Sequence, residues 1–277
     1  MPTEAEEQSG AARDTVLFLF AHQDDEFGVF GHIADEKRRG IDVVCAYLTD
    51  GGWNGQDIAI RNAETIAVLR DLGVPSTAVL MIGERASVPD GKLHLHVESA
   101  WQALERSLAG RRVARVFMPA WEGGHQDHDV THLVGLRVAA RHGVLDQSRQ
   151  FPLYHGAGLV GPLFRTFSPL PENGPVHRLP VSRSECLKYS TWLLRYRSQI
   201  KSIAGLLIPA TFGLTWKGGY LTQPVDVART SARPHPGALL YERRVLLSFE
   251  ELMTTTARFR AALISDNAAR YHEPAGA

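Results

Sequence analysis

Residues 15–26 read TVLFLFAHQDDE, and this stretch decides the fold. Its first part, Thr15–Ala21, is nearly all apolar and rich in residues that favour β-structure, which is typical of a strand covered on both faces. One imidazole and three carboxylates follow at once, within residues 22–26. Because ligands bind beyond the carboxyl ends of strands in parallel sheets, these polar residues predict a functional site at the end of this strand.

Short apolar runs alternate with amphipathic stretches along the first half of the chain. The sequence predicts strands at 15–21, 42–49, 78–82 and 113–118, and helices at 26–39, 57–72, 93–108 and 128–141. Strands alternating with helices of this length are typical of βαβ units. We therefore predict an α/β fold, a Rossmann-like three-layer sandwich with a mainly parallel sheet.

The last third of the chain is less regular. The sequence predicts a strand at about 151–155, a helix with a capping box from Ser182 to about Ala204, a strand at Leu239–Ser248 and a helix at Phe249–Leu263. Residues 205–237 are rich in Gly and Pro and predict an irregular loop or lid. We expect residues 1–13 to form a disordered tail and residues 14–277 to form a single α/β domain.

Composition excludes several classes of protein. The 277 residues include 30 Lys+Arg and 30 Asp+Glu, so the basic surplus typical of nucleic-acid binding is missing. No apolar run approaches the roughly 18 residues that a membrane span needs, and the acidic start is unlike a signal peptide. We expect a cytoplasmic protein without a nucleic-acid partner or a membrane span. With only two cysteines, a metal site would rest on His, Asp and Glu.

A second polar cluster, GGHQDHD at 123–129, follows the fourth predicted strand. Both clusters should therefore lie at the same edge of the sheet. His22, Asp25 and His128 together would offer two imidazoles and one carboxylate with a fourth position open, a pattern suited to catalytic Zn²⁺ and also to ions such as Fe²⁺. Asp24 would then remain free to act as a base.

The two clusters resemble known motifs. AHQDDE and HQDH are similar to the AHPDDE and HPDH motifs of the PIG-L/LmbE-like zinc deacetylases, with Gln23 and Gln126 in place of the prolines. Weaker similarities are Thr49-Asp-Gly51, Arg61-Asn-Ala-Glu64 and Tyr196-Arg-Ser-Gln199. The resemblance covers about residues 14–142 well and about 182–204 loosely.

The resemblance implies a role for each matching residue. It implies zinc on His22, Asp25 and His128, and Asp24 as the general base. His125 would stabilise the oxyanion or donate a proton, with Asp127 as the partner that orients it and raises its pKa. Arg61 and Glu64 would lie near the substrate. The two glutamines put the rigidity of the turns in doubt, since proline fixes φ.

These residues suit amide hydrolysis. Zinc lowers the pKa of a bound water to about 7, Asp24 can accept its proton, and the metal with His125 can meet the developing negative charge. We therefore predict removal of the N-acetyl group from an acetamido-sugar or glycoconjugate, releasing acetate and a free amine. Trp53, in a Gly-rich loop after the second strand, could offer an aromatic face to the sugar.

Two alternatives remain open. The same site could cleave a larger amide in a sugar-thiol, lipid or antibiotic conjugate. The chain could also be a metal-binding or sugar-binding module without catalysis, which only the two glutamines favour. The Gly/Pro-rich region around Trp216 and Tyr220 could form a lid or a contact in a homo-oligomer.

Overall fold

A computed structural model describes residues 14–269 except 201–210, 212, 215 and 217. The expected tail at 1–13 therefore lies outside the described residues, as does much of the first part of the expected loop at 205–237. Among the described residues, no helix combines the length and apolar character needed to cross a membrane.

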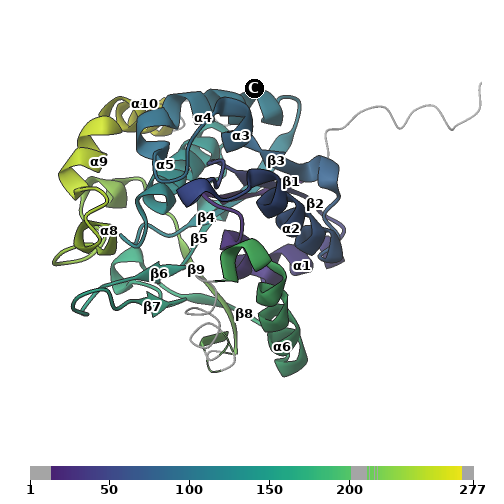
Figure 1. Ribbon diagram of the computed structural model, residues 1–277. Coiled ribbons are helices and arrows are strands. Elements are labelled where there is room, and N and C mark those ends of the chain that lie inside the picture. The colour runs from purple at the N-terminus through teal and green to yellow at the C-terminus, as the bar shows by residue number, and fades with distance from the viewer. Residues whose placement is uncertain (1–13, 201–210, 212, 215, 217, 270–277) are drawn as a thin grey trace, which may run out of the picture.

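A seven-stranded sheet forms the centre of the molecule (Figure 1). In spatial order its strands are β3 (Val79–Met81), β2 (Asp42–Tyr47), β1 (Asp14–Phe20), β4 (Arg112–Pro119), β5 (Arg149–Phe151), β9 (Gly219–Pro224) and β8 (His177–Pro180). The first five run parallel, whereas β9 pairs antiparallel with both β5 and β8. A short antiparallel pair, β6 (Tyr154–His155) and β7 (Arg165–Thr166), stands apart.

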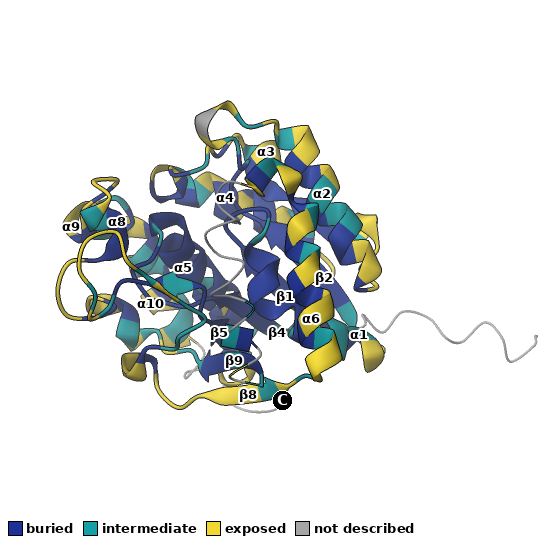
Figure 2. Ribbon diagram, turned by 60° about the horizontal axis from the view of Figure 1, so that its bottom comes forward, coloured by how far each residue is buried: buried dark blue, intermediate teal, exposed yellow. Residues whose placement is uncertain are grey.

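Helices cover both faces of the sheet (Figures 1 and 2). One face carries α1 (Phe30–Arg38), α2 (Ile58–Asp71) and α6 (Arg183–Trp192), and the other carries α3 (Ile82–Ala86), α4 (Leu93–Leu108), α5 (Gln126–Arg141), α9 (Phe249–Thr255) and α10 (Ala257–Ala269). Helix α8 (Leu240–Arg243) is a single turn. The predicted three-layer α/β architecture is confirmed.

The apolar run of β1 supplies both hydrophobic cores. Because side chains alternate along a strand, Leu17 and Leu19 enter the core beneath α4 and α5, while Val16, Phe18 and Phe20 enter the core beneath α1 and α2. All of these side chains are buried. This is why the strand reads as a continuous apolar run.

The order of the strands fixes where a site can form. β2 and β3 lie on one side of β1, and β4 and β5 lie on the other. The connections therefore leave β1 and β4 in opposite directions, and a crevice opens between their carboxyl ends. Residues 22–26 and 120–128 follow these two ends directly.

Local signals in the sequence are confirmed where they depend on short-range hydrogen bonds. Asp57 caps α2 by accepting the N–H groups of Ala59 and Ile60. Ser182 and Glu185 form the predicted capping box of α6. However, α6 ends at Trp192 and short 3-10 turns follow, so the continuous helix predicted up to Ala204 is wrong over its described part.

Two predictions for the last third are wrong. Residues 239–248 form α8 and a turn instead of a strand, because the Glu242 carboxylate accepts the N–H groups of Leu239 and Phe249 and closes the segment on itself. The region expected to be irregular, 205–237, contains strand β9, which fills the sheet between β5 and β8. Tyr220 on β9 is buried in the core, so it is not a surface contact.

The approach of α3 to the end of β2 gives a test of this packing. A Cβ atom on Gly83 would lie 2.0 Å from the backbone carbon of Thr49, so Gly83→Ala must move one of the two segments. We expect a loss of about 3 kcal/mol in the free energy of unfolding, measured by urea denaturation. Gly110→Ala is the control: nothing lies within 4 Å, and only its positive φ should cost about 1 kcal/mol. Equal losses would contradict the close packing.

Candidate metal site

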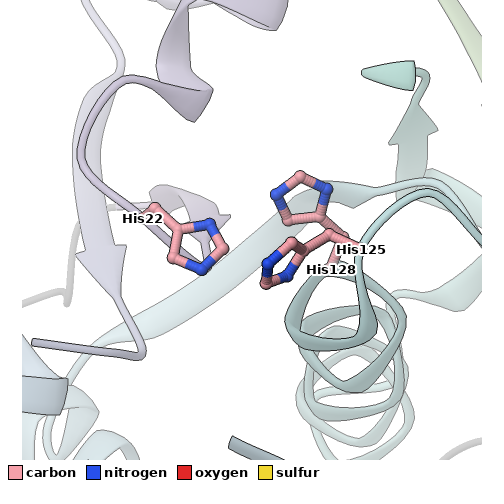
Figure 3. A group of neighbouring side chains, drawn as sticks. All are labelled: His22, His125 and His128. Atoms are coloured by element: carbon pink, nitrogen blue, oxygen red, sulfur yellow. The ribbon is translucent and has the colours of Figure 1, made fainter. Parts of the chain in front are cut away.

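Three imidazole rings meet in the crevice between β1 and β4 (Figure 3). His22 follows β1, whereas His125 and His128 lie at the start of α5. Their ligand nitrogens all lie within 4.8 Å of one another. The structure thus brings together two sequence clusters about 100 residues apart, as the sheet topology predicted.

His128 and Asp25 have the contacts expected of two ligands to one ion. Nε2 of His128 lies 3.1 Å from Oδ1 of Asp25, yet both ring nitrogens of His128 are buried without a hydrogen-bond partner among the described residues. The other carboxylate oxygen of Asp25 is held by the N–H groups of Ala21 and His22. Ligand atoms on a tetrahedral zinc ion with bonds of about 2.0 Å lie about 3.3 Å apart, so this pair fits a shared cation.

His22 completes the group from the other side. Its Nδ1 lies 3.7 Å from Asp25, while its Nε2 lies 3.2 Å from Asp90 and 3.3 Å from Asp127. Burial works to lower the pKa of His22, but these three carboxylates outweigh it and raise the pKa. A ring with one nitrogen facing a ligand site and the other on a carboxylate is the usual arrangement of a metal-binding histidine.

Asp127 has a different neighbour from the one expected. Its carboxylate approaches His22 and accepts the N–H groups of Gly91 and Leu93, so it does not hold the ring of His125. His125 instead accepts the backbone N–H of Asp127 at its Nδ1, which also caps α5. The expected pairing of the two side chains is wrong because helix α5 turns the Asp127 side chain toward the loop that precedes α4.

This geometry also sets the protonation of His125. Burial, and then the neighbouring His22, lower the pKa of His125 to about 3, although Asp127 acts in the opposite direction. The ring is therefore neutral, which corrects the expectation of a raised pKa. Because Nδ1 accepts a hydrogen bond, the proton resides on Nε2, and the ring can donate from that atom.

Asp24 lies in the same pocket under backbone strain. Its φ of 115° is in a region that residues other than glycine rarely adopt. The Glu26 carboxylate accepts the N–H of Asp24 and the hydroxyl of Tyr196, which ties the turn to a distant segment. Burial raises the pKa of Asp24 to about 7, although Arg61 lowers it. A carboxylate with such a pKa suits proton transfer near neutral pH.

A pocket of about 410 Å³ opens from these residues, and Trp53, Arg61 and Asp90 form part of its lining. Arg61 is buried and donates to the carbonyl oxygens of Gly51 and Gln23, with Asp90 3.6 Å away. The exposed ring of Trp53 lies beside Gly91, where an added Cβ would meet it at 2.9 Å. The pocket therefore offers one aromatic face beside fixed polar groups.

Glu64, expected near the substrate, is not among the residues that line this pocket. Its carboxylate accepts both the N–H and the hydroxyl of Ser198. The next residue, Gln199, does line the pocket. Glu64 thus acts on the pocket indirectly, by fixing the turn that carries Gln199.

The glutamines at the positions of the family prolines form cross-links between loops. Gln23 donates to Asn62 (2.7 Å) and to the carbonyl oxygen of Asp50 (3.2 Å). Gln126 donates to the carbonyl oxygen of Gly91 at 3.3 Å. The turns therefore gain side-chain hydrogen bonds where proline would have fixed φ.

Sequence reasoning missed several residues of the pocket. Asp90 could have been found, because it follows the third strand at the same edge of the sheet. Gln199 belongs to the weaker Tyr196–Gln199 similarity, whereas the others from the irregular part of the chain had no comparable signal: Leu153, Thr166, Phe167, Leu193, Arg244 and Leu246. These residues form the part of the lining that lies outside the segment 17–139.

Comparison with known proteins agrees with this geometry. Residues 17–139 match the family model PIG-L, described as GlcNAc-PI de-N-acetylase. The chain contains a PIG-L family domain. This segment holds every residue of the metal-site cluster described above, including Asp24, His125 and Asp127. No curated protein matches the chain.

Solved structures share the fold of this chain. The A40926 pseudoaglycone deacetylase has a TM-score of 0.54 and 18% identity, with 80% of this chain and 100% of that chain covered. N,N'-diacetylchitobiose deacetylase from Pyrococcus horikoshii has a TM-score of 0.51 and 20% identity, with 76% of this chain and 82% of that chain covered. The zinc-inhibited form of teicoplanin deacetylase has a TM-score of 0.51 and 15% identity, with 76% of this chain and 97% of that chain covered. At these identities the likeness establishes the fold.

The carboxyl group of Glu122, between β4 and α5, gives a test of the electrostatics beside the site. It accepts the N–H groups of Leu153 and Tyr154, yet burial raises its pKa from the ordinary 4.5 to about 8. Between these values the folded protein holds a proton that the unfolded chain has released. The free energy of unfolding should therefore fall as the pH rises through this window, by a few kcal/mol in total.

Glu122→Gln removes this titrating group, so its free energy of unfolding should fall by a few kcal/mol less than that of the wild type between about pH 5 and about pH 8.5. Urea denaturation of both proteins at the two pH values measures the difference. Glu250→Gln, on the surface of α9, is the matched control and should follow the wild type. The same decline in Glu122→Gln as in the wild type would show that Glu122 is ionised in the folded protein.

Proposed function

We propose that this protein is a metal-dependent N-deacetylase that hydrolyses the acetamido group of a sugar or glycoconjugate and releases acetate and a free amine. The main support is the 3.1 Å approach of the unpartnered His128 nitrogen to Asp25, with His22 beside them and Asp24 in the same pocket. The PIG-L match over residues 17–139 points to the same chemistry.

His22, Asp25 and His128 would hold the metal. Two imidazoles and one carboxylate suit zinc, with Fe²⁺ as an alternative. When bound, such an ion lowers the pKa of water and polarises an amide carbonyl. Asp127 and Asp90 would keep the ring of His22 oriented through its Nε2.

The remaining polar groups divide the proton transfers between them. Asp24, with its pKa raised by burial, would accept the proton of the attacking water. His125, neutral with its proton on Nε2, would donate a hydrogen bond to the oxygen that becomes negatively charged. Protonated Asp24 would then be the nearest acid for the leaving amine, since His125 has no second proton to give.

The substrate class follows from the pocket and from the proteins that share its fold. Trp53 offers a face for the apolar side of a sugar ring, and Arg61 and Asp90 offer partners for its hydroxyl groups. The structures of similar fold include deacetylases named for N,N'-diacetylchitobiose and for an antibiotic pseudoaglycone. The first name describes an acetylated amino-sugar, and the second describes a larger molecule.

The pocket lining also includes apolar side chains beyond the metal-site segment, among them Leu153, Phe167 and Leu246, and this additional surface favours a conjugate over a free sugar. Cleavage of a larger amide would use the same metal-site residues. A binding module without catalysis is less well supported, because Asp24 stays in a strained backbone conformation beside the ligand group.

Metal analysis with variants tests the proposal. His128→Ala should reduce zinc from about one ion per chain to a small fraction, because two ligands cannot hold it tightly. Asp24→Asn should retain zinc but lose about 10²- to 10⁴-fold in turnover of an N-acetylglucosamine conjugate. Zinc is measured by mass spectrometry and turnover by acetate release.

His177→Ala, an exposed histidine on β8, is the control and should match the wild type in both measurements. Zinc should be added at a single equivalent, and Fe²⁺ in parallel, because a related fold is known in a zinc-inhibited form. Full zinc in His128→Ala, or full turnover in Asp24→Asn, would overturn the proposal.

A further inference from the structure

One cation of the pocket lining, Arg244, lies among aromatic and apolar side chains, and we define the Arg244 cluster as Tyr154, Phe164, Arg244 and Leu246. Tyr154 comes from β6 and Phe164 from the loop before β7, while Arg244 and Leu246 follow α8. All four lie outside the segment that matches the PIG-L model. Tyr154, Arg244 and Leu246 line the same pocket as the metal-site residues.

Aromatic rings hold Arg244 close to the reaction centre. The carbon at the centre of its guanidinium group lies 5.9 Å from the ring centroid of Tyr154 and 5.8 Å from that of Phe164. The Tyr154 ring in turn lies 5.4 Å from the ring of His128. The Tyr154 ring therefore contacts both the guanidinium group and a proposed metal ligand.

Arg244 also differs from the other arginines nearby, because its guanidinium group has no hydrogen-bond or ion-pair partner among the described residues. Arg61 is buried, close to Asp90 and bonded to backbone carbonyl oxygens. Arg243 donates to the carbonyl oxygens of Ala238 and Gly156. Arg244 remains exposed, with contacts to two rings that leave its N–H groups able to bind a ligand.

The turn that presents Arg244 is strained. Val245 has a φ of 57°, which is rare for a β-branched residue, and it is 90% exposed. The N–H groups of Val245 and Leu246 bond to the carbonyl oxygens of Glu242 and Tyr241, and these bonds hold the turn. The strained residue itself faces solvent, while its two neighbours reach the pocket, as expected where a backbone is bent to position a site.

We propose that Arg244 binds an anionic group, a carboxylate or a phosphate, on the aglycone of the substrate. This inference rests on the proposed deacetylase function and adds the substrate class: acidic conjugates of an acetamido-sugar. The sugar occupies the side of Trp53 and Asp90, and the acidic group lies against Tyr154 and Arg244. A guanidinium group stacked on rings keeps its forked donors oriented, which suits either anion.

Two conjugates that differ only in charge provide the test. The 4-carboxyphenyl and 4-carbamoylphenyl N-acetylglucosaminides have nearly the same shape, but only the first carries a negative charge. We expect zinc-loaded wild-type protein to prefer the carboxylate about tenfold in kcat/KM, and the preference to shrink at high salt. In Arg244→Gln the ratio of the two values should approach one, and Arg244→Lys should be intermediate.

Arg258→Gln on α10 removes the same charge from a surface outside the pocket and should keep the wild-type ratio. A ratio near one in the wild type, with both conjugates hydrolysed, would overturn the inference and leave the deacetylase function standing. An unchanged ratio in Arg244→Gln would also overturn it.

Binding supplies a measurement that does not need turnover. Dissociation constants of both conjugates are measured by calorimetry with zinc-loaded Asp24→Asn, with and without Arg244→Gln. Tighter binding of the carboxylate conjugate that is lost in Arg244→Gln supports the inference. If the wild type hydrolyses neither conjugate, this result still supports Arg244 as the anion site, and only the proposed deacetylase function is overturned. Equal binding of the two conjugates counts against Arg244 as the anion site.

Discussion

Buried negative charge at the carboxyl end of β1 is the constraint on which the rest of this structure depends. Asp25 and Asp127 are buried, Asp90 has little exposure, and all three carboxylates surround the single imidazole of His22. Burying each carboxylate in its charged form costs several kcal/mol of folding free energy unless a positive charge lies beside it. Protonation of His22 or a bound cation can supply it, and the unpartnered His128 nitrogen favours the cation.

The loops around the site are built to hold those charges in place. Asp127 ties the start of α5 to the loop before α4, and Gln126 adds a second bond to the same loop at Gly91. Arg61 ties α2 to the turns after β1 and β2. The strain at Asp24 persists because these elements fix the turn from several sides. The backbone around the proposed metal ligands is thereby set before any ligand arrives, which lowers the cost of reaching a reactive geometry.

The sequence predicted well whatever depends on periodicity and short-range bonding. The β1 strand, the cap of α2 at Asp57 and helix α4 at Leu93–Leu108 were all predicted, and the topology then placed the two polar clusters together. The sequence did not predict side-chain directions. Asp127 contacts His22 and Glu64 contacts Ser198, because the rotation of a helix and the position of a distant turn decide these contacts. Residues 239–248 failed as a strand because Glu242 bonds to both ends of the segment, which an apolar pattern cannot reveal.

The groups proposed for catalysis and the residues that would select the substrate come from different parts of the chain. The PIG-L segment carries the groups that would hold a metal and move protons, on strand ends whose positions the sheet dictates. Other parts of the pocket lining come from β6, the turns after α6 and the turn after α8, which meet only through long-range packing. Changes in those segments can alter what fits beside the sugar without disturbing the charged cluster. Substrate choice in this protein should therefore be sought in residues 153–246, where the sequence pattern is least informative.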